Sequence, residues 1–211
     1  MGIFRITKKT IGRPQGFQYP IGLSFGVTGE TTILTENVAT NTTGGTKTVD
    51  VTNSFAVHTF TESGTFDPSF SGTVEYLVVA GGGSGAMLFG AGGAGGVQQG
   101  TIQVESTETY NVTVGGGGSA PARGSGGGGA GTGANGTNSS FATISATGGG
   151  GGGANQPGFS GGSGGGGGQW NNTRYYGGAG ESTAKFPREG FPGDGTPFVQ
   201  HTSGGGGGGV L

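Results

Sequence analysis

The second half of the chain, from Gly81 onward, sets the tightest limit on the fold because more than one residue in three is glycine. Uninterrupted glycine runs occur at 115–118, 126–129, 148–153, 164–168 and 204–209. Ordering one residue's backbone costs roughly 1–2 kcal/mol, and glycine is at the costly end with no side chain to bury. This half therefore either lacks a fixed structure or is built from glycine backbone itself.

The ordered alternative is a set of polyproline II-type helices made of glycine, packed side by side. Such a helix has three residues per turn, and its N–H and C=O groups point outward to neighbouring helices. Leu88, Ala91, Ala94 and Val97 are spaced by three, with glycines between them. They would form one apolar edge on a threefold helix, whereas they would alternate faces on a strand. This spacing favours threefold winding over a chance pattern.

The overall composition supports order and excludes several classes of protein. Charged residues make up 9% of the chain, whereas disordered chains are normally rich in charge. A net charge of −2 gives no electrostatic case for binding nucleic acid or a membrane surface. The absence of cysteine rules out disulfides and thiolate sites. We expect no signal peptide and no membrane insertion, because the chain has no long apolar run.

The first 17 residues read as a basic arm. They carry Arg5, Lys8, Lys9 and Arg13, and no acidic residue precedes Glu30. Such an arm is either a solvated tail or a segment that docks onto a partner.

Alternating apolar and polar residues predict several strands after this arm. We expect strands at 18–28, 32–34, 48–60, 73–80, 101–105, 109–114 and 140–146, with turns at Gly44-Gly45 and Ser63-Gly64. The strand at 73–80 is apolar on both faces near its end, which is typical of a central strand. The predicted fold is mainly β with almost no α-helix. Its predicted parts are the arm (1–17), an N-terminal β-rich attachment module (18–80) and a glycine-rich, polyglycine II-like domain with short strands and displayed loops (81–211).

Motifs for chemistry are nearly absent. Gly81-x-Gly83-x-x-Ala86 follows a strand and fits the dinucleotide-binding fingerprint, which requires a helix directly afterwards. Six glycines between residues 87 and 101 would cost such a helix about 6 kcal/mol relative to alanine, so the match is coincidental. The histidines and acids show no catalytic or metal-ligand spacing. We therefore expect no enzyme activity, no cofactor and no metal.

Aromatic and polar inserts separate the glycine runs at 154–160, 169–176 and 181–202. Aromatics give large contact area at low entropic cost, and Asn and Arg add adaptable hydrogen bonds, as in antibody paratopes. The candidate binding residues are Phe159, Trp170, Asn171, Asn172, Arg174, Tyr175, Tyr176, Phe186, Arg188, Phe191 and Phe198. The alternative is that these aromatics cap the ends of the glycine helices as small cores.

Two stretches resemble the glycine-rich domain of bacteriophage tail-fibre and virion proteins. One is Phe60–Phe66 followed by Val74–Val79 and Gly81-Gly82-Gly83-Ser84-Gly85; the other is Asn135–Phe141 followed by Thr147–Gly150. The resemblance covers about residues 57–211, and the first 56 residues do not resemble the attachment module of an adhesin. It implies a polyglycine-type bundle like those of tail-fibre tip adhesins in T-even-like phages, where variable loops contact the bacterial surface.

This resemblance implies a non-enzymatic virion protein, made in the host cytoplasm and carried on the phage tail or fibre. Its N-terminal region, including Arg5, Lys8, Lys9 and Arg13, would dock onto other virion proteins. Its loops would bind a bacterial surface glycan or outer-membrane protein. A homotrimer would fit a fibre, and a monomer would fit a tip adhesin. The alternative is a purely structural virion protein, such as a capsid decoration, head-fibre or tail-associated protein that binds only other virion proteins.

Overall fold

The fold is mainly β. A computed structural model describes residues 2–6, 41–50, 55–87, 90–122, 131–168, 175–180 and 189–194. These residues form nine strands and no helix, which confirms the predicted fold class. The strands are β1 (Gly2–Ile6), β2 (Thr46–Asp50), β3 (Phe55–Phe60), β4 (Gly64–Phe66), β5 (Gly72–Val79), β6 (Val97–Val104), β7 (Tyr110–Thr113), β8 (Ser139–Phe141) and β9 (Ile144–Ala146). The described part of the chain has no helix that could cross a membrane.

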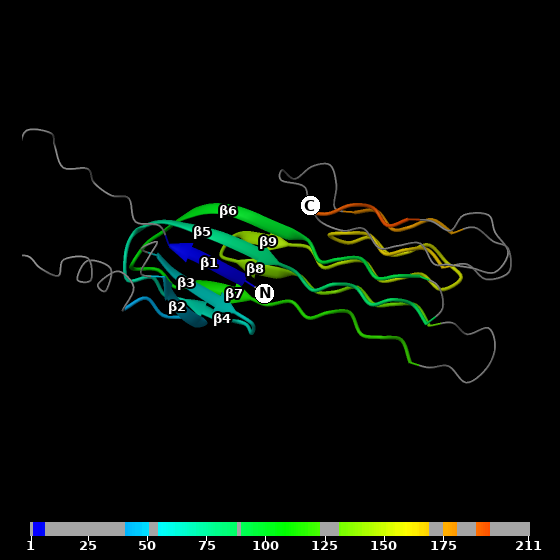
Figure 1. The fold of residues 1–211 in the computed structure, drawn as a ribbon, viewed down its shortest axis with the longest axis horizontal. Coiled ribbons are helices and arrows are strands. Elements are labelled where there is room, and N and C mark those ends of the chain that lie inside the picture. The colour runs from blue at the N-terminus through cyan, green and yellow to red at the C-terminus, as the bar shows by residue number, and fades with distance from the viewer. Residues whose placement is uncertain are drawn as a thin grey trace, which may run out of the picture.

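Two antiparallel sheets lie face to face as a sandwich. The larger sheet has the order β2-β3-β1-β5-β6, and the smaller has the order β4-β7-β8-β9 (Figure 1). β5 lies between β1 and β6, so the prediction of a central strand at 73–80 is confirmed. Its pairing with β6 is the longest among the described strands, running from Gly72 opposite Val104 to Val79 opposite Val97.

The apolar core fills the space between the two sheets. The larger sheet contributes Phe60, Val74, Val78 and Val104, and the smaller contributes Phe66, Val112, Phe141 and Ala146. Phe66 and Phe141 are fully buried, and their ring centroids lie 5.9 Å apart in an edge-to-face arrangement. Because successive side chains on a strand point to opposite faces, the alternating apolar residues of both sheets meet in one layer.

Two predicted strands are in fact pairs of strands. The region 48–60 was predicted as one strand but contains the last three residues of β2 and all of β3, which pair antiparallel with Thr48 opposite Val57. The region 140–146 is a hairpin of β8 and β9, with Ala142 at a φ of 52° between them. Tight hairpin turns need positive φ, which glycine and asparagine usually supply, so an alanine there gave no turn signal.

The predicted boundaries also need correction. Residues 2–6 of the predicted arm form β1, which lies between β3 and β5 rather than extending freely. Arg5 is opposite Val57 and Glu75 in the register. Strands β6–β9 follow Gly81 yet complete the sandwich, so residue 81 does not divide two domains. The other basic residues, Lys8, Lys9 and Arg13, and the strands predicted at 18–28 and 32–34 lie outside the described residues.

Extended glycine-rich segments leave one end of the sandwich and run side by side (Figure 1). We call them the glycine bundle, and they comprise residues 80–87, 90–96, 115–122, 131–138, 147–153, 158–162, 163–168, 175–180 and 189–194. They alternate in direction, away from the sandwich and back. We call the end of the bundle that lies away from the sandwich the distal end.

Hydrogen bonds between these segments recur in steps of three residues. The N–H groups of Ala80, Gly83 and Ala86 donate to the carbonyls of Gly96, Gly93 and Gly90. Those of Gly81, Ser84 and Met87 donate to Thr137, Ala134 and Gly131 on another segment. A β-ladder would repeat every two residues, whereas a threefold helix repeats every three. The polyglycine II conformation itself stays a prediction.

Most of these glycines are required by close packing. A Cβ built on Gly149 would lie 2.2 Å from the carbonyl oxygen of Gly93, and one on Gly83 would lie 2.2 Å from that of Gly150. Real Cβ atoms do not approach so closely. Gly116, at the margin of the bundle, differs because a Cβ there would meet nothing within 4 Å.

We therefore predict opposite outcomes for two alanine substitutions. Gly149→Ala should lower the free energy of unfolding by about 1–3 kcal/mol or more, because the added methyl overlaps a neighbouring backbone. Gly116→Ala should be neutral or stabilise by up to about 1 kcal/mol, because it only restricts the unfolded chain. Urea denaturation followed by circular dichroism compares them. Equal losses in both variants would contradict this packing.

His58 is a fully buried polar group in the sandwich. Its Nδ1 donates to the carbonyl oxygen of Gly44 at 2.7 Å, and its ring packs edge-on against Phe66 at 5.3 Å. Nε2 has no partner among the described residues. Gly44 and Gly45 adopt φ values of 114° and 61°, which confirms the predicted turn. Burial lowers the pKa of His58, and the nearby charge of Lys47 lowers it further, while the bond to Gly44 opposes both.

This lowered pKa predicts acid sensitivity. The folded state holds His58 neutral, so its contribution to stability is complete above the unfolded pKa of about 6.5 and is lost as the pH falls below it. The loss should be at most about 1.4 kcal/mol per pH unit. Urea midpoints between neutral and mildly acidic pH measure it. His58→Asn keeps a donor for Gly44 but does not titrate, so it should flatten the pH dependence. An unchanged slope in this variant would show that another group is responsible.

Candidate functional site

The predicted binding inserts begin and end at different ends of the bundle. Gly168 and Tyr175, which flank residues 169–174, lie at the distal end, where the N–H of Gly168 donates to the carbonyl of Gln156 (Figure 1). Gly180 and Glu189, which flank residues 181–188, lie at the sandwich end. There the carbonyl of Glu189 accepts a hydrogen bond from Val97, the first residue of β6. The three inserts therefore do not all meet at one end.

Two exposed aromatic residues lie on neighbouring segments of the distal half. Tyr176 is 64% exposed and Phe159 is 38% exposed. The N–H of Gly158 donates to the carbonyl of Tyr176 at 2.9 Å, so Phe159 and Tyr176 belong to directly paired segments. We call these two residues the aromatic pair. Among the described residues, Val49 is the one other large apolar side chain that is exposed.

The remaining candidate residues are placed differently or lie outside the described part. Tyr175, next to the aromatic pair, is half-buried. Phe191 is half-buried in segment 189–194, near the sandwich, and its carbonyl accepts a hydrogen bond from Gly164. Phe191 is therefore not part of the distal surface. The candidates outside the described residues are Trp170, Asn171, Asn172, Arg174, Phe186, Arg188 and Phe198.

Glu189 anchors the base of segment 189–194, a role for which its sequence context gave no signal. Its side chain is fully buried. Oε1 accepts a hydrogen bond from Nε2 of Gln98 at 2.7 Å, and Oε2 accepts one from the backbone N–H of Thr147 at 2.7 Å. The carboxylate thus joins the last described segment to the start of β6 and the end of β9.

Asparagine side chains complete the backbone pairing inside the bundle. Asn135 accepts from the N–H of Gly151 and donates to the carbonyl of Ser160. Asn138 accepts from the N–H of Gly148. Both residues belong to a stretch on which the family resemblance rests, and their amides act within the fold. They hold three segments at fixed separations.

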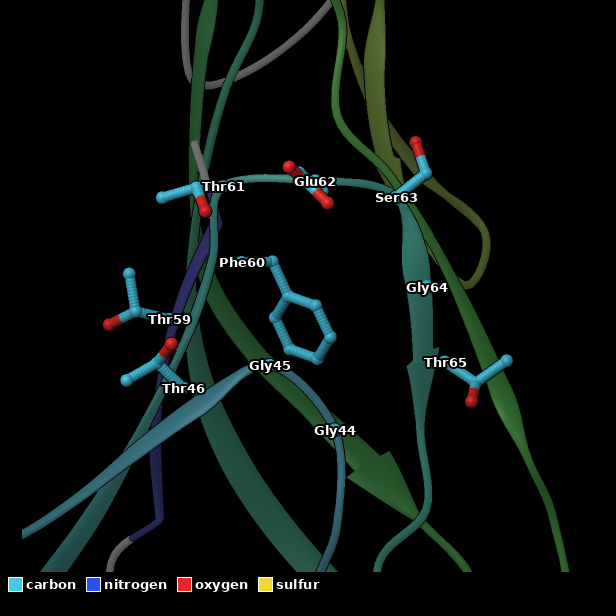
Figure 2. Close-up of a pocket in the computed structure, with 10 residues that line it drawn as sticks. All are labelled: Gly44, Gly45, Thr46, Thr59, Phe60, Thr61, Glu62, Ser63, Gly64 and Thr65. Atoms are coloured by element: carbon cyan, nitrogen blue, oxygen red, sulfur yellow. The ribbon is translucent and has the colours of Figure 1, made fainter.

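A hollow of about 400 Å³ lies between the end of β3 and the start of β4. It is lined by Gly44, Gly45, Thr46, Thr59, Phe60, Thr61, Glu62, Ser63, Gly64 and Thr65. Figure 2 shows the hydroxyl groups of Thr46, Thr59, Ser63 and Thr65 pointing away on either side of the Phe60 ring. The Ser63 hydroxyl already accepts from the N–H of Val114, and that of Thr65 donates to Asp67. No polar groups converge here, so the hollow is a poor candidate for a ligand site.

Two other kinds of site find no support in the described part of the chain. It contains no group of three or more His, Asp or Glu that could hold a metal. Residues 81–87 are not helical, and their backbone bonds to four other segments of the bundle. The helix that the dinucleotide fingerprint requires is therefore missing from this position.

The family model described as Glycine-rich domain matches residues 60–211. The match begins at the last residue of β3 and takes in β4–β9 together with the glycine bundle. The chain therefore belongs to the glycine-rich domain family. No curated protein and no solved structure matched the chain. The finer part of the resemblance, to phage tail-fibre proteins, stays a prediction.

An exchange of side chains tests the anchor at Glu189. Glu189→Gln should destabilise by about 1–3 kcal/mol, because its amide cannot accept from both Gln98 and Thr147. Gln98→Glu should also destabilise, because it places two carboxylates together. In the double variant, the amide oxygen at position 189 accepts from the N–H of Thr147, and the amide NH2 at position 189 donates to the carboxylate at position 98. The double variant should therefore be more stable than either single variant. Thermal unfolding measures all four proteins, and strictly additive losses would contradict the direct bond.

Proposed function

We propose that this chain is a phage virion protein of the tail-fibre or adhesin type, which recognises the bacterial surface with the distal end of its glycine bundle. The observation that carries the proposal is the aromatic pair, Phe159 and Tyr176. Both aromatic side chains are exposed, in a chain whose composition is otherwise rich in polar residues and glycine. The phage setting rests on the sequence resemblance.

The bundle suits this role physically. Its segments are tied together by backbone hydrogen bonds at about every third residue, so the aromatic pair is displayed on a regular support. A rigid support lowers the entropy lost when a displayed side chain binds. Aromatic side chains combine large contact area with few rotatable bonds. The receptor would be a surface glycan or an outer-membrane protein, and Trp170, Asn171, Asn172 and Arg174 would contribute from the insert that begins and ends at the distal end.

The direction of β1 supports a separate docking role for the opposite end of the molecule. Ile6 is opposite Val74, whereas Gly2 is opposite Val78, close to where β5 enters the bundle. The chain therefore leaves β1 at the end of the sandwich that is remote from the bundle. Docking onto other virion proteins is proposed for this remote end, with Lys8, Lys9 and Arg13 as the basic residues that follow β1.

A cell-binding assay tests the proposal. Labelled protein would be titrated onto candidate host bacteria, together with the variants Tyr176→Ala and Phe159→Ala. Each should weaken binding by about tenfold or more, the effect expected from losing an interface hot spot. Val49→Ala is the matched control, because it removes an exposed apolar side chain of the sandwich and should bind normally.

Two other results have distinct meanings. Unchanged binding by both aromatic variants would remove the aromatic pair from the receptor site. A full-length variant with residues 169–176 replaced by Gly and Ser would then test the neighbouring insert. No binding to any bacterium that the parent phage infects would contradict the adhesin function and favour a purely structural virion protein.

A further inference from the structure

Segment 115–122 lies at the margin of the glycine bundle. It is the lowest segment of the bundle in Figure 1, and no described segment lies on its outer side. It contacts two neighbours, 80–87 and 131–138: the N–H of Gly118 donates to Gly82 at 2.8 Å, and the N–H of Thr137 donates to Gly116 at 3.0 Å. One side of this segment is therefore paired and the other faces outward.

The glycines of this segment fall into two kinds. A Cβ on Gly115 would lie 2.1 Å from a backbone oxygen of segment 131–138, and a Cβ on Gly118 would lie 2.0 Å from another. Packing within the chain therefore requires glycine at both positions. Gly116 has nothing within 4 Å of such a Cβ, and Gly117 has only the carbonyl oxygen of Gly82 at 3.6 Å. Both residues are exposed. The described residues of the same chain give no packing reason for glycine at these two positions.

Gly117 also has unused hydrogen-bonding groups. Neither its N–H nor its carbonyl has a partner among the described residues. Exposed, unpaired backbone groups are a template for pairing with another chain, as at the edge of a β-sheet. The N–H and carbonyl of the adjacent Gly116 are already bonded to Thr137. No charged side chain occurs in segment 115–122 to prevent close approach. Gly116 and Gly117 thus form an uncharged strip without side chains, which we call the glycine edge.

We propose that the glycine edge pairs with the same edge of a second copy of this chain. Pairing inside the bundle shows which kind of segment can bind to such a surface. Segments 131–138 and 147–153 pair antiparallel through Gly133 to Gly152 and Gly136 to Gly149, with glycine on both sides. A partner must likewise lack side chains to come this close, and the glycine edge of another copy does. Gly117 offers a donor and an acceptor, so the pairing is self-complementary about a twofold axis.

The experiment measures self-association of the full-length protein by sedimentation over a range of concentrations. The wild type should form a dimer. Gly117→Val should raise the dimer dissociation constant by about tenfold or more, because its side chain prevents the two backbones from meeting. At a concentration where both proteins are monomeric, its circular dichroism and melting temperature should match the wild type, because a Cβ at this position fits within one copy. Gly116→Ala is a milder second variant in case the valine perturbs the fold.

Gly64→Val is the matched control. Gly64 is also exposed, and a Cβ there would meet only the Phe60 ring at 3.9 Å, but it lies on β4 in the sandwich. This variant should dimerise like the wild type. Equal dimerisation of the Gly117→Val and wild-type proteins would overturn the proposal, as would a monomeric wild type. If that monomer dimerises when Gly206 and Gly207 are replaced by valine, the edge is instead covered by the chain's own glycine run at 204–209.

Discussion

The structure depends on backbone hydrogen bonds between segments that approach one another without side chains in between. Gly149 illustrates the constraint, since it bonds to Gly81 through its N–H and leaves no room for a methyl group beside Gly93. Each such bond contributes modestly, about 0.5–1.5 kcal/mol, and ordering a glycine is costly. The bundle is therefore stable only if many bonds form together in a fixed register. One added side chain would disturb several segments at once.

The sandwich supplies that register. Strands β5 to β9 lead into or out of the bundle, so the strand pairings fix where each glycine segment begins. The core between Phe66 and Phe141 stabilises the sheets by apolar burial, which the glycine segments cannot provide for themselves. Side-chain bonds at the junction, from Glu189, Asn138 and Thr137, join the two kinds of structure. The proposed recognition surface is thus held in place by a core at the other end of the molecule.

The sequence predicted the fold where one local signal was sufficient. The apolar run of β5 indicated a central strand, Gly44-Gly45 indicated a turn, and the glycine runs indicated segments whose hydrogen bonds repeat every three residues. Prediction failed where the cause was remote in sequence or where a turn used an unusual residue. The short strand β1 is recognisable only through its partners β3 and β5, and the hairpin at Ala142 uses a residue that rarely adopts positive φ. For the site, the sequence placed Tyr176 and Phe159 among the candidate binding residues, a role that stays a prediction. The anchoring role of Glu189 depends on Gln98, a contact across 91 residues.

The absence of apolar side chains inside the bundle has a thermal consequence. Exposing apolar surface raises the heat capacity of unfolding, and exposing polar backbone lowers it. The sandwich, with its buried phenylalanines and valines, should follow the usual curve and lose stability on cooling. The bundle, whose interior is mostly peptide backbone, contributes little or negative heat capacity and should hold its structure in the cold. One chain therefore joins two kinds of structure that respond differently to cooling, and the glycine bundle is the one less affected by cold.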